Sequence, residues 1–338
     1  MSLRIARKPR LEKGERFDIV IVGGGPAGLS AAVYVARFLL KSVVVTIDVG
    51  GQLNWTEWID DYPGFSKIKA SELTSKFREH AEGSGVRVVT GFEVVDIKKE
   101  GEEFRIVGSG GNEIFAKAVI LAAGSRRRKL GVPGEDKFKG RGVSYCSICD
   151  GPLYKGKRAV AVVGGGDAAL EGAALLSGYV GKVYLIHRRD SFRAKPVLVE
   201  DVKRRENVEL VLNSVVTEIL GEEEVRAVKV RGPKGEATLD VDGVFVEIGQ
   251  EPPVELFRRI GVETDEQGYV KVGEWMETNI PGIFAAGDAT SLWRGFRQVV
   301  TAAAMGSVAA YSAYQYLLEK GLMGGRGEGE GANKEGLA

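Results

Sequence analysis

Two stretches of the chain repeat one order of apolar and polar positions. Residues 18–22 (DIVIV) and 158–163 (RAVAVV) are short runs dominated by apolar, β-branched residues, and each precedes a glycine-rich turn and a helical stretch. Such runs are typical of strands that are buried on both faces of a parallel sheet. A further apolar run follows each helix, at 42–47 and 182–186. The pattern predicts two βαβ units and therefore an α/β fold.

The rest of the pattern predicts how the two units are connected. Residues 86–107 and 208–230 are rich in β-formers and end at the turn sequences 108–112 and 231–235, so we expect a meander packed on each unit. Glycine, proline and charge interrupt the pattern at 124–129 and 249–253, where two chain crossings between domains would fit. The second unit is then an insertion in the first. The predicted boundaries are an N-terminal extension (1–16), a first domain in two segments (17–127 and 251–322), an inserted second domain with the cysteine pair (128–250) and a flexible tail (323–338).

Composition and charge narrow the possible partners. The chain has 338 residues, 44% of them hydrophobic, and a formal net charge of +1. This is enough apolar material for two cores, and no overall field favours nucleic acid or an acidic membrane. The basic segment 1–17 lacks an apolar signal-peptide core, and no run reaches the length of a membrane span. We therefore expect a cytoplasmic protein with neither nucleic acid nor membrane as partner.

The first glycine-rich turn has the spacing of a dinucleotide fingerprint. Gly23, Gly25 and Gly28 form G-x-G-x-x-G between the predicted strand and helix. In this motif the glycines allow a tight turn, the approach of a pyrophosphate and close helix packing. Asp48, 25 residues after Gly23 (48 − 23), follows the next strand and would accept hydrogen bonds from a ribose. Because its carboxylate would repel a 2′-phosphate, this site suits FAD or NAD and not NADP.

The second fingerprint ends in basic residues instead of an acid. Gly164, Gly166 and Ala169 occupy the fingerprint positions, and the next strand runs into the sequence HRRDSFR at 187–193. Three guanidinium groups stand there, and guanidinium binds phosphate through bidentate, charge-assisted hydrogen bonds. The sequence therefore predicts an NADP site. The plainer interpretation, a solvated basic turn, is weakened by the fingerprint beside it.

The only two cysteines of the chain, Cys146 and Cys149, lie between the two fingerprints. A Cys-x-x-Cys pair can alternate between dithiol and disulfide, and Asp150 beside it could carry a proton. The alternative is half of a zinc site, which needs four nitrogen or sulfur ligands. Only His80 and His187 remain as histidine ligands. Since His187 already has a place at the phosphate site, zinc would need a second chain, and we predict no metal.

Together these motifs closely resemble those of the low-molecular-weight thioredoxin reductases, from about Phe17 to Leu318. The resemblance includes the segments 50–53 (GGQL), 122–124 (AAG) and 187–194 (HRRDSFRA). It implies FAD and NADPH as cofactors, with a thioredoxin or a glutaredoxin-like protein as the partner. The implied flavin site comprises Gly23, Gly25, Pro26, Ala27, Gly28, Asp48, Gly51, Gln52, Leu53, Asp61, Gly124, Gly287, Asp288, Arg297 and Gln298. The implied NADPH site comprises Gly164, Gly166, Asp167, Ala168, Ala169, His187, Arg188, Arg189 and Arg193.

The resemblance also implies a mechanism. Cys149 would be the sulfur on the flavin side, Cys146 the sulfur that attacks the partner, and Asp150 the acid-base group. The family works as a homodimer whose NADPH domain rotates against its FAD domain, with 124–129 and 249–253 as candidate hinges. Two positions depart from the family pattern: Asp61 stands where asparagine is common, and Asp167-Ala168 replaces Asn-Thr or Asp-Ser.

Two other functions are compatible with the motifs. One is a flavoprotein oxidase that reduces oxygen, peroxide or quinones and in which the cysteines are incidental. The other is a non-catalytic sensor that binds a dinucleotide and reports the redox state of the cysteines. Two nucleotide sites joined by a thiol pair favour the reductase over both.

Overall fold

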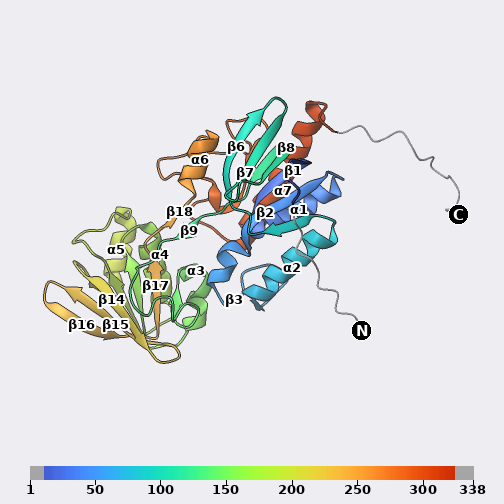
Figure 1. The fold of residues 1–338 in the computed structure, drawn as a ribbon. Coiled ribbons are helices and arrows are strands. Elements are labelled where there is room, and N and C mark those ends of the chain that lie inside the picture. Colours follow the sequence, from blue (N-terminus) through green and yellow to red (C-terminus); the bar gives the residue numbers. More distant parts are fainter. Residues whose placement is uncertain (1–10, 324–338) are drawn as a thin grey trace, which may run out of the picture.

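A computed structural model of the chain describes residues 11–323. Residues 1–10 and 324–338, which include most of the predicted N-terminal extension and nearly all of the predicted tail, lie outside the described residues. The described chain forms two parts, each built around its own parallel sheet, as Figure 1 shows. The predicted fold class is confirmed.

The first part is built on a seven-stranded sheet in the order β5-β2-β1-β8-β7-β6, with β19 beside the end of β8. The strands β5, β2, β1, β8 and β19 run parallel, while β6 and β7 form antiparallel pairs. The strands are β1 (Glu15–Gly24), β2 (Ser42–Val49), β5 (Arg87–Thr90), β6 (Val94–Glu100), β7 (Glu103–Gly108), β8 (Glu113–Leu121) and β19 (Ile283–Ala285). The helices are α1 (Pro26–Arg37), α2 (Ala70–Gly83), α6 (Val254–Ile260) and α7 (Val299–Glu319).

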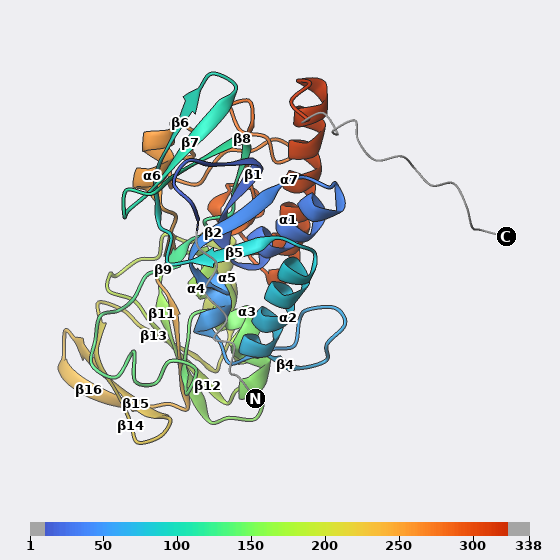
Figure 2. The same ribbon diagram turned by 45° about the vertical axis from the view of Figure 1, so that its right-hand side comes forward.

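Strand β1 shows why the central strands of this sheet are apolar at nearly every position and do not alternate with polar residues. Ile19 and Ile21 face the core under α1 and α7, whereas Val20 and Val22 face a second core on the other side of the sheet. Both faces are covered, so both sets of side chains are removed from water. Helices α1 and α7 lie side by side in Figure 2 and approach closely, because a Cβ atom on Gly306 would lie 2.0 Å from the carbonyl oxygen of Ala27.

The second part repeats this plan. Its parallel sheet has the order β10-β17-β11-β12-β13, and an antiparallel sheet β14-β15-β16 covers one face. The strands are β10 (Val143–Ser144), β11 (Ala159–Gly164), β12 (Lys182–Ile186), β13 (Val208–Val211), β14 (Val215–Gly221), β15 (Val225–Gly232), β16 (Gly235–Asp240) and β17 (Gly243–Glu247). The helices are α3 (Ser147–Asp150), α4 (Asp167–Ser177) and α5 (Pro196–Arg204).

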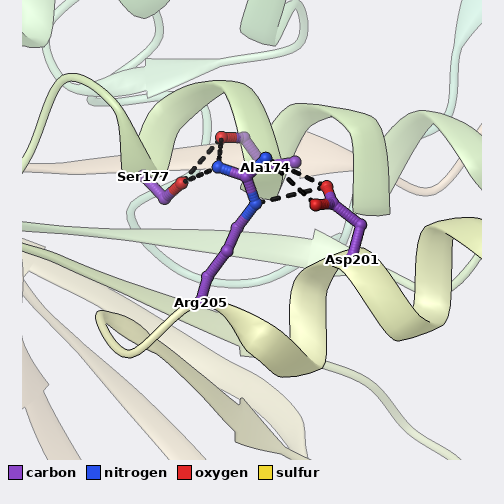
Figure 3. A network of polar contacts seen from close by, with 4 residues as sticks. All are labelled: Ala174, Ser177, Asp201 and Arg205. Atoms are coloured by element: carbon purple, nitrogen blue, oxygen red, sulfur yellow. Dashed lines mark hydrogen bonds and ion pairs between the residues drawn. The ribbon is translucent and has the colours of Figure 1, made fainter.

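Arg205 ties the two helices α4 and α5 of the second part together (Figure 3). Its guanidinium donates to the Ala174 carbonyl at 3.1 Å and to Ser177 Oγ at 2.9 Å, near the end of α4. The same group pairs with Asp201 of α5 at 3.0 Å. A cation among the last carbonyls of a helix also interacts favourably with the helix dipole.

The chain passes between the two parts at one place. The two-residue strands β9 (Arg126–Arg127) and β18 (Gln250–Glu251) pair antiparallel there. The short hairpin β3 (Trp58–Ile59) and β4 (Ile68–Lys69) and the 3₁₀ turns η1 (Gly51–Trp55), η2 (Gly151–Tyr154) and η3 (Gly287–Ala289) complete the fold. The paired strands fall within the two segments that we expect to act as hinges.

Two details differ from the predicted elements. The segments expected to be meanders each begin with a strand, β5 and β13, that belongs to the parallel sheet instead. The first helix, expected after the glycine-rich turn, already begins within that turn at Pro26 and ends at Arg37. Pro26 has a fixed φ that suits the first helical turn, and Leu39 lies at φ +58°, which no helix continues.

Candidate functional site

Cys146 and Cys149 form a disulfide on a short helical turn. Cys146 precedes α3 and Cys149 lies within it, with a Cα–Cα distance of 5.3 Å. The backbone N–H of Cys149 donates to Cys146 Sγ at 3.1 Å. This bond favours negative charge on Cys146 when the disulfide opens. The pair is therefore organised for redox chemistry, and neither sulfur is a free thiolate for zinc.

Asp150 follows Cys149 and receives two hydrogen bonds. Ser144 Oγ donates to its Oδ2 at 2.6 Å, and Thr56 Oγ donates to its Oδ1 at 2.9 Å. Burial raises the pKa of Asp150, although the two hydroxyl donors and Arg127 act in the opposite direction. A carboxyl group whose pKa is raised in this way can hold a proton beside the cysteine pair.

The disulfide turn lies against the first part of the molecule. Cys149 Sγ is 3.6 Å from Gln298 Oε1, at the start of α7. Trp55, on η1 of the first part, meets the Tyr145 ring edge-on at 5.2 Å and has the ammonium group of Lys139 3.7 Å from its ring centre. Together with the Thr56–Asp150 bond, these contacts hold the cysteines against the part that carries the first fingerprint.

A cluster of polar side chains lies near this contact. Gln52 donates to Asp288 at 2.5 Å and accepts from Arg127 at 2.9 Å. Arg297 donates to the Tyr269 hydroxyl at 3.0 Å, but its buried Nε and Nη2 have no partner among the described residues. Buried donors without a partner are costly, so their presence indicates that a ligand completes the cluster. A group rich in acceptors, such as a flavin, fits these donors.

The first fingerprint has the shape of a nucleotide cradle. A Cβ atom on Gly23 would lie 2.1 Å from the carbonyl oxygen of Ala122, and one on Gly28 would lie 1.9 Å from that of Gly23. A Cβ on Gly25, in contrast, would meet nothing closer than 3.9 Å. Two glycines therefore serve packing, and the third leaves room for a ligand. Gly25 is the N-cap of helix α1 and provides no side-chain cap, so the free N–H groups of the first helical turn can bind phosphate.

Most of the other expected flavin residues gather around this cradle. A Cβ on Gly51 would lie 3.5 Å from the Cα of Gly25, and one on Gly287 would lie 2.9 Å from the Cβ of Ala27. Asp48 is exposed at the end of β2. Pro26 begins α1, Leu53 is buried on η1, and Gly124 follows β8 with φ +63°.

Asp61 is the exception within this group. It is exposed between β3 and β4, and within residues 11–323 no hydrogen bond or ion pair joins it to the cluster. Partial burial and the neighbouring Asp60 raise its pKa. The structure does not bring it together with the other expected flavin residues.

The second fingerprint repeats the division of roles among its small residues. A Cβ on Gly164 would lie 2.3 Å from the carbonyl oxygen of Glu247 and 2.6 Å from the Cβ of Ala169, whereas a Cβ on Gly166 would meet nothing within 4 Å. Helix α4 likewise starts without a side-chain cap. Asp167 and Ala168 begin this helix, and the Asp167 carboxylate is occupied by the backbone N–H of Lys195 at 2.9 Å and its ammonium at 3.3 Å.

The basic loop after β12 lies beside this second cradle. Arg193 N–H donates to the Gly165 carbonyl at 2.9 Å, so loop and cradle are joined directly. Arg188, Arg189 and Arg193 are exposed, and within the described chain none of their guanidinium groups pairs with an acid. His187 is buried, stacks on Phe192 at 5.4 Å, and leaves its Nε2 without a partner. Three unneutralised guanidinium groups at this place fit a 2′-phosphate.

Sequence reasoning missed three residues of the site: Thr56, Arg127 and Glu247. Thr56 and Arg127 come close to the cysteines only through the tertiary fold, and nothing local marks them. Glu247 did carry a signal, because it is an acid at the end of the apolar run GVFVE, a run to which the sequence analysis gave no role. Its carboxylate accepts two hydrogen bonds from Ser147, between the cysteines.

Metal ligation and membrane insertion find no support in the described residues. Within 11–323 no three or more His, Cys, Asp or Glu side chains gather in a way that could hold a metal ion. In the same range no helix combines the length and the apolar character needed to cross a bilayer. His80 is exposed on α2, far in sequence from the cysteines.

Comparison with known proteins agrees with this geometry. The pattern of the family described as pyridine nucleotide-disulphide oxidoreductase matches residues 17–306, so the chain belongs to this family. Within the family it is similar to thioredoxin reductases. It is 42% identical over 317 residues to the thioredoxin reductase of Bacillus subtilis, a match that covers 90% of this chain and 95% of the relative.

Solved structures extend the likeness to three dimensions. The thioredoxin reductase of Streptococcus pyogenes superposes with a TM-score of 0.84 at 35% identity, covering 90% of this chain and 99% of that one. The Lactococcus lactis thioredoxin reductase in its FR conformation gives a TM-score of 0.62 at 36% identity and the same coverage. Identity and coverage are nearly the same in the two comparisons, so the lower TM-score does not come from a more distant sequence.

Proposed function

We propose that this protein is an NADPH-dependent thioredoxin-disulfide reductase that uses FAD. The observation that carries the proposal is the position of the Cys146–Cys149 disulfide: Cys149 lies 3.6 Å from Gln298 of the first part, and the adjacent Asp150 accepts a hydrogen bond from Thr56 of that part. FAD, when bound, supplies a carrier that takes two electrons from NADPH and passes them to a disulfide. The first cradle, with Asp48, suits FAD, and the second, with its free arginines, suits NADPH.

The chain's own residues would then act as follows. The disulfide accepts two electrons, and two protons are taken up: one forms the thiol of Cys149 and the other is held by Asp150, which leaves Cys146 as the thiolate. Cys146, whose sulfur accepts the N–H of Cys149, attacks the disulfide of the partner and forms a mixed disulfide. Cys149 then attacks Cys146, and the partner leaves as a dithiol. The partner is a small redox protein with an accessible disulfide, a thioredoxin or a glutaredoxin-like protein.

A change of domain arrangement is part of the proposal. In the present structure Cys149 lies against Gln298, and the turn is held there by Thr56 and Trp55, so the dithiol must move to reach a large partner. The paired strands β9 and β18 are the pivot that we propose. The lower TM-score of the Lactococcus lactis structure in its FR conformation, at nearly the same identity, supports this motion.

The oligomeric state and location follow from the same family. We propose a homodimer in the cytoplasm. Aromatic residues just after α1 and on α7 offer apolar surface for such contact: the half-buried Phe38 stacks on the half-buried Tyr314 at 4.6 Å and lies 6.2 Å from the exposed Tyr311. Light scattering of the purified protein measures the mass directly, and a monomer at micromolar concentration would contradict the dimer.

The deciding experiment is steady-state reduction of thioredoxin with NADPH and with NADH. We expect a yellow protein whose absorbance bleaches with anaerobic NADPH, rapid reduction of thioredoxin, and loss of this activity in Cys146→Ser. The double cysteine variant should still bleach. If it also consumed oxygen as fast as the wild type reduces thioredoxin, the oxidase function would replace this one. Absence of turnover with every acceptor would favour the sensor.

A further inference from the structure

Glu247 is an acidic residue that none of the proposed steps uses. It ends β17, and its side chain points toward α3 rather than toward an ion-pair partner. One carboxylate oxygen, Oε1, accepts both the backbone N–H and the hydroxyl of Ser147, each at 2.9 Å. Ser147 follows Cys146 and is 2% exposed. The carboxylate is thus fixed to the turn that carries the disulfide.

Packing leaves this arrangement little freedom. Helix α4 passes over the pair at Gly172, where a Cβ atom would lie 2.5 Å from Ser147 Oγ and 4.0 Å from Glu247 Cγ. Only glycine leaves room for the serine hydroxyl here. The carboxylate therefore cannot be displaced from Ser147 without moving α3 or α4.

Its charge also bears on the cysteines. Burial raises the pKa of Glu247, while Arg127 on β9 and the two bonds from Ser147 favour the ionised form, and Asp150 on α3 opposes it. A carboxylate near two sulfurs disfavours the thiolate form because like charges repel across a partly buried site. This makes the dithiol a stronger reductant.

We propose that Glu247 is a positioning residue for the redox-active turn and that its charge lowers the reduction potential of the Cys146–Cys149 couple. The inference rests on the proposed function only in taking these two cysteines as the redox pair. The redox titration that measures this potential needs neither NADPH nor a protein partner, so its result is separate from the reductase assignment.

The experiment is a redox titration of the purified flavin-loaded protein in glutathione buffers, with the dithiol fraction counted by alkylation and mass spectrometry. Glu247→Gln keeps an oxygen that can accept from Ser147 but removes the charge. We expect its equilibrium constant for reduction by glutathione to rise about tenfold, equivalent to about 30 mV for a two-electron couple. Glu247→Asp keeps the charge but withdraws it from Ser147. Thioredoxin reduction should therefore slow, while the equilibrium constant for reduction by glutathione should stay within about twofold of the wild-type value.

Asp242→Asn is the matched control. Asp242 precedes the same strand and likewise accepts two donors, the N–H groups of Arg158 and Ala159, at 2.8 and 3.2 Å. Its loss should leave the potential unchanged. A Glu247→Gln potential no different from this control overturns the proposal. If Glu247→Gln did not fold, Ser147→Ala would decide, because it leaves the carboxylate with one donor fewer. The carboxylate then lacks a bond that favours its ionised form, so the couple should become more oxidising, and an unchanged or more reducing couple would contradict the inference.

Discussion

Thr56 Oγ donates to Asp150 Oδ1 at 2.9 Å, a hydrogen bond that joins the two parts of the molecule. Thr56 follows η1 of the first part, whereas Asp150 ends α3 of the second. Rotation about β9 and β18 must break this bond together with the Trp55–Tyr145 contact. The bond therefore stabilises one arrangement of the protein without necessarily stabilising its fold.

Replacing Thr56 by valine tests this role. The loss of one hydrogen bond to a charged acceptor, about 1.5 kcal/mol, should shift the population toward the other arrangement about tenfold. Thioredoxin contacts should form more readily in that arrangement, while transfer to the disulfide should slow. Stopped-flow absorbance separates the two steps, and Thr56→Ser, which keeps the hydroxyl, is the control. Equal rates in Thr56→Val and wild type would show that the bond does not bias the arrangement.

Asp150 predicts a dependence of stability on pH. Burial raises its pKa above the ordinary 3.8, so the folded protein holds this proton more firmly than the unfolded chain. The resulting stabilisation is complete below about pH 3.8 and is lost as the pH rises through the folded value. Asp150→Asn removes this loss, so its Tm should fall less between acid and neutral pH. Turnover with thioredoxin should drop by about 10²-fold or more.

A Tm profile for Asp150→Asn parallel to that of the wild type would contradict the pH prediction. Asp201→Asn is a suitable control, since Asp201 is an exposed carboxylate outside the site. It should affect stability without a comparable loss of turnover.

Mutations in the basic loop after β12 should change the KM for NADPH more than the KM for NADH. Replacing Arg188 and Arg189 by glutamine should raise the KM for NADPH about 10- to 100-fold, because charge-assisted bonds to a phosphate contribute about 1.5–3 kcal/mol each. The KM for NADH should change less than about threefold, since NADH has no 2′-phosphate. Equal loss with both cofactors would mean that the arginines act on the loop and not on phosphate.

Replacing Arg205, in the same domain, should instead lower the stability without changing cofactor binding. Its five hydrogen bonds to Ala174, Ser177 and Asp201 join α4 to α5 (Figure 3), so Arg205→Ala should destabilise the domain by about 1–3 kcal/mol. Differential scanning calorimetry should detect a lower Tm, while the KM values for both cofactors remain near those of the wild type. A selective rise in the KM for NADPH would place Arg205 at the cofactor instead.

Alanine substitutions at two glycines of the first fingerprint should have different effects, one on folding and the other on flavin binding. Gly28→Ala places a Cβ 1.9 Å from the Gly23 carbonyl, so it should prevent correct folding of the first part. Gly25→Ala meets nothing closer than 3.9 Å and should fold, but its methyl group enters the space for the pyrophosphate. We expect a folded, colourless Gly25→Ala protein. A fully flavin-loaded Gly25→Ala protein would place the pyrophosphate elsewhere.

The features that could be predicted from the sequence are those that depend on the spacing of residues close together in the chain. Strands, glycine turns and the cysteine pair are local patterns, and strand 182–186 was predicted with the bounds of β12. The sequence did not predict β5 and β13 as parallel strands, because a short β-branched run does not reveal its neighbour. Thr56, Arg127 and Glu247 act through partners 75 or more residues away, and no spacing rule reaches so far.

The pairing of Arg127 with Gln250 places the start and the end of the second part side by side. A domain whose two ends lie side by side can be replaced as one segment, because both of its connections to the rest of the chain are at the same place. Grafting the corresponding segment from a relative with an acid in place of the arginines should convert the cofactor preference while leaving the flavin domain intact. The nicotinamide specificity of such enzymes can thus evolve separately from their flavin chemistry.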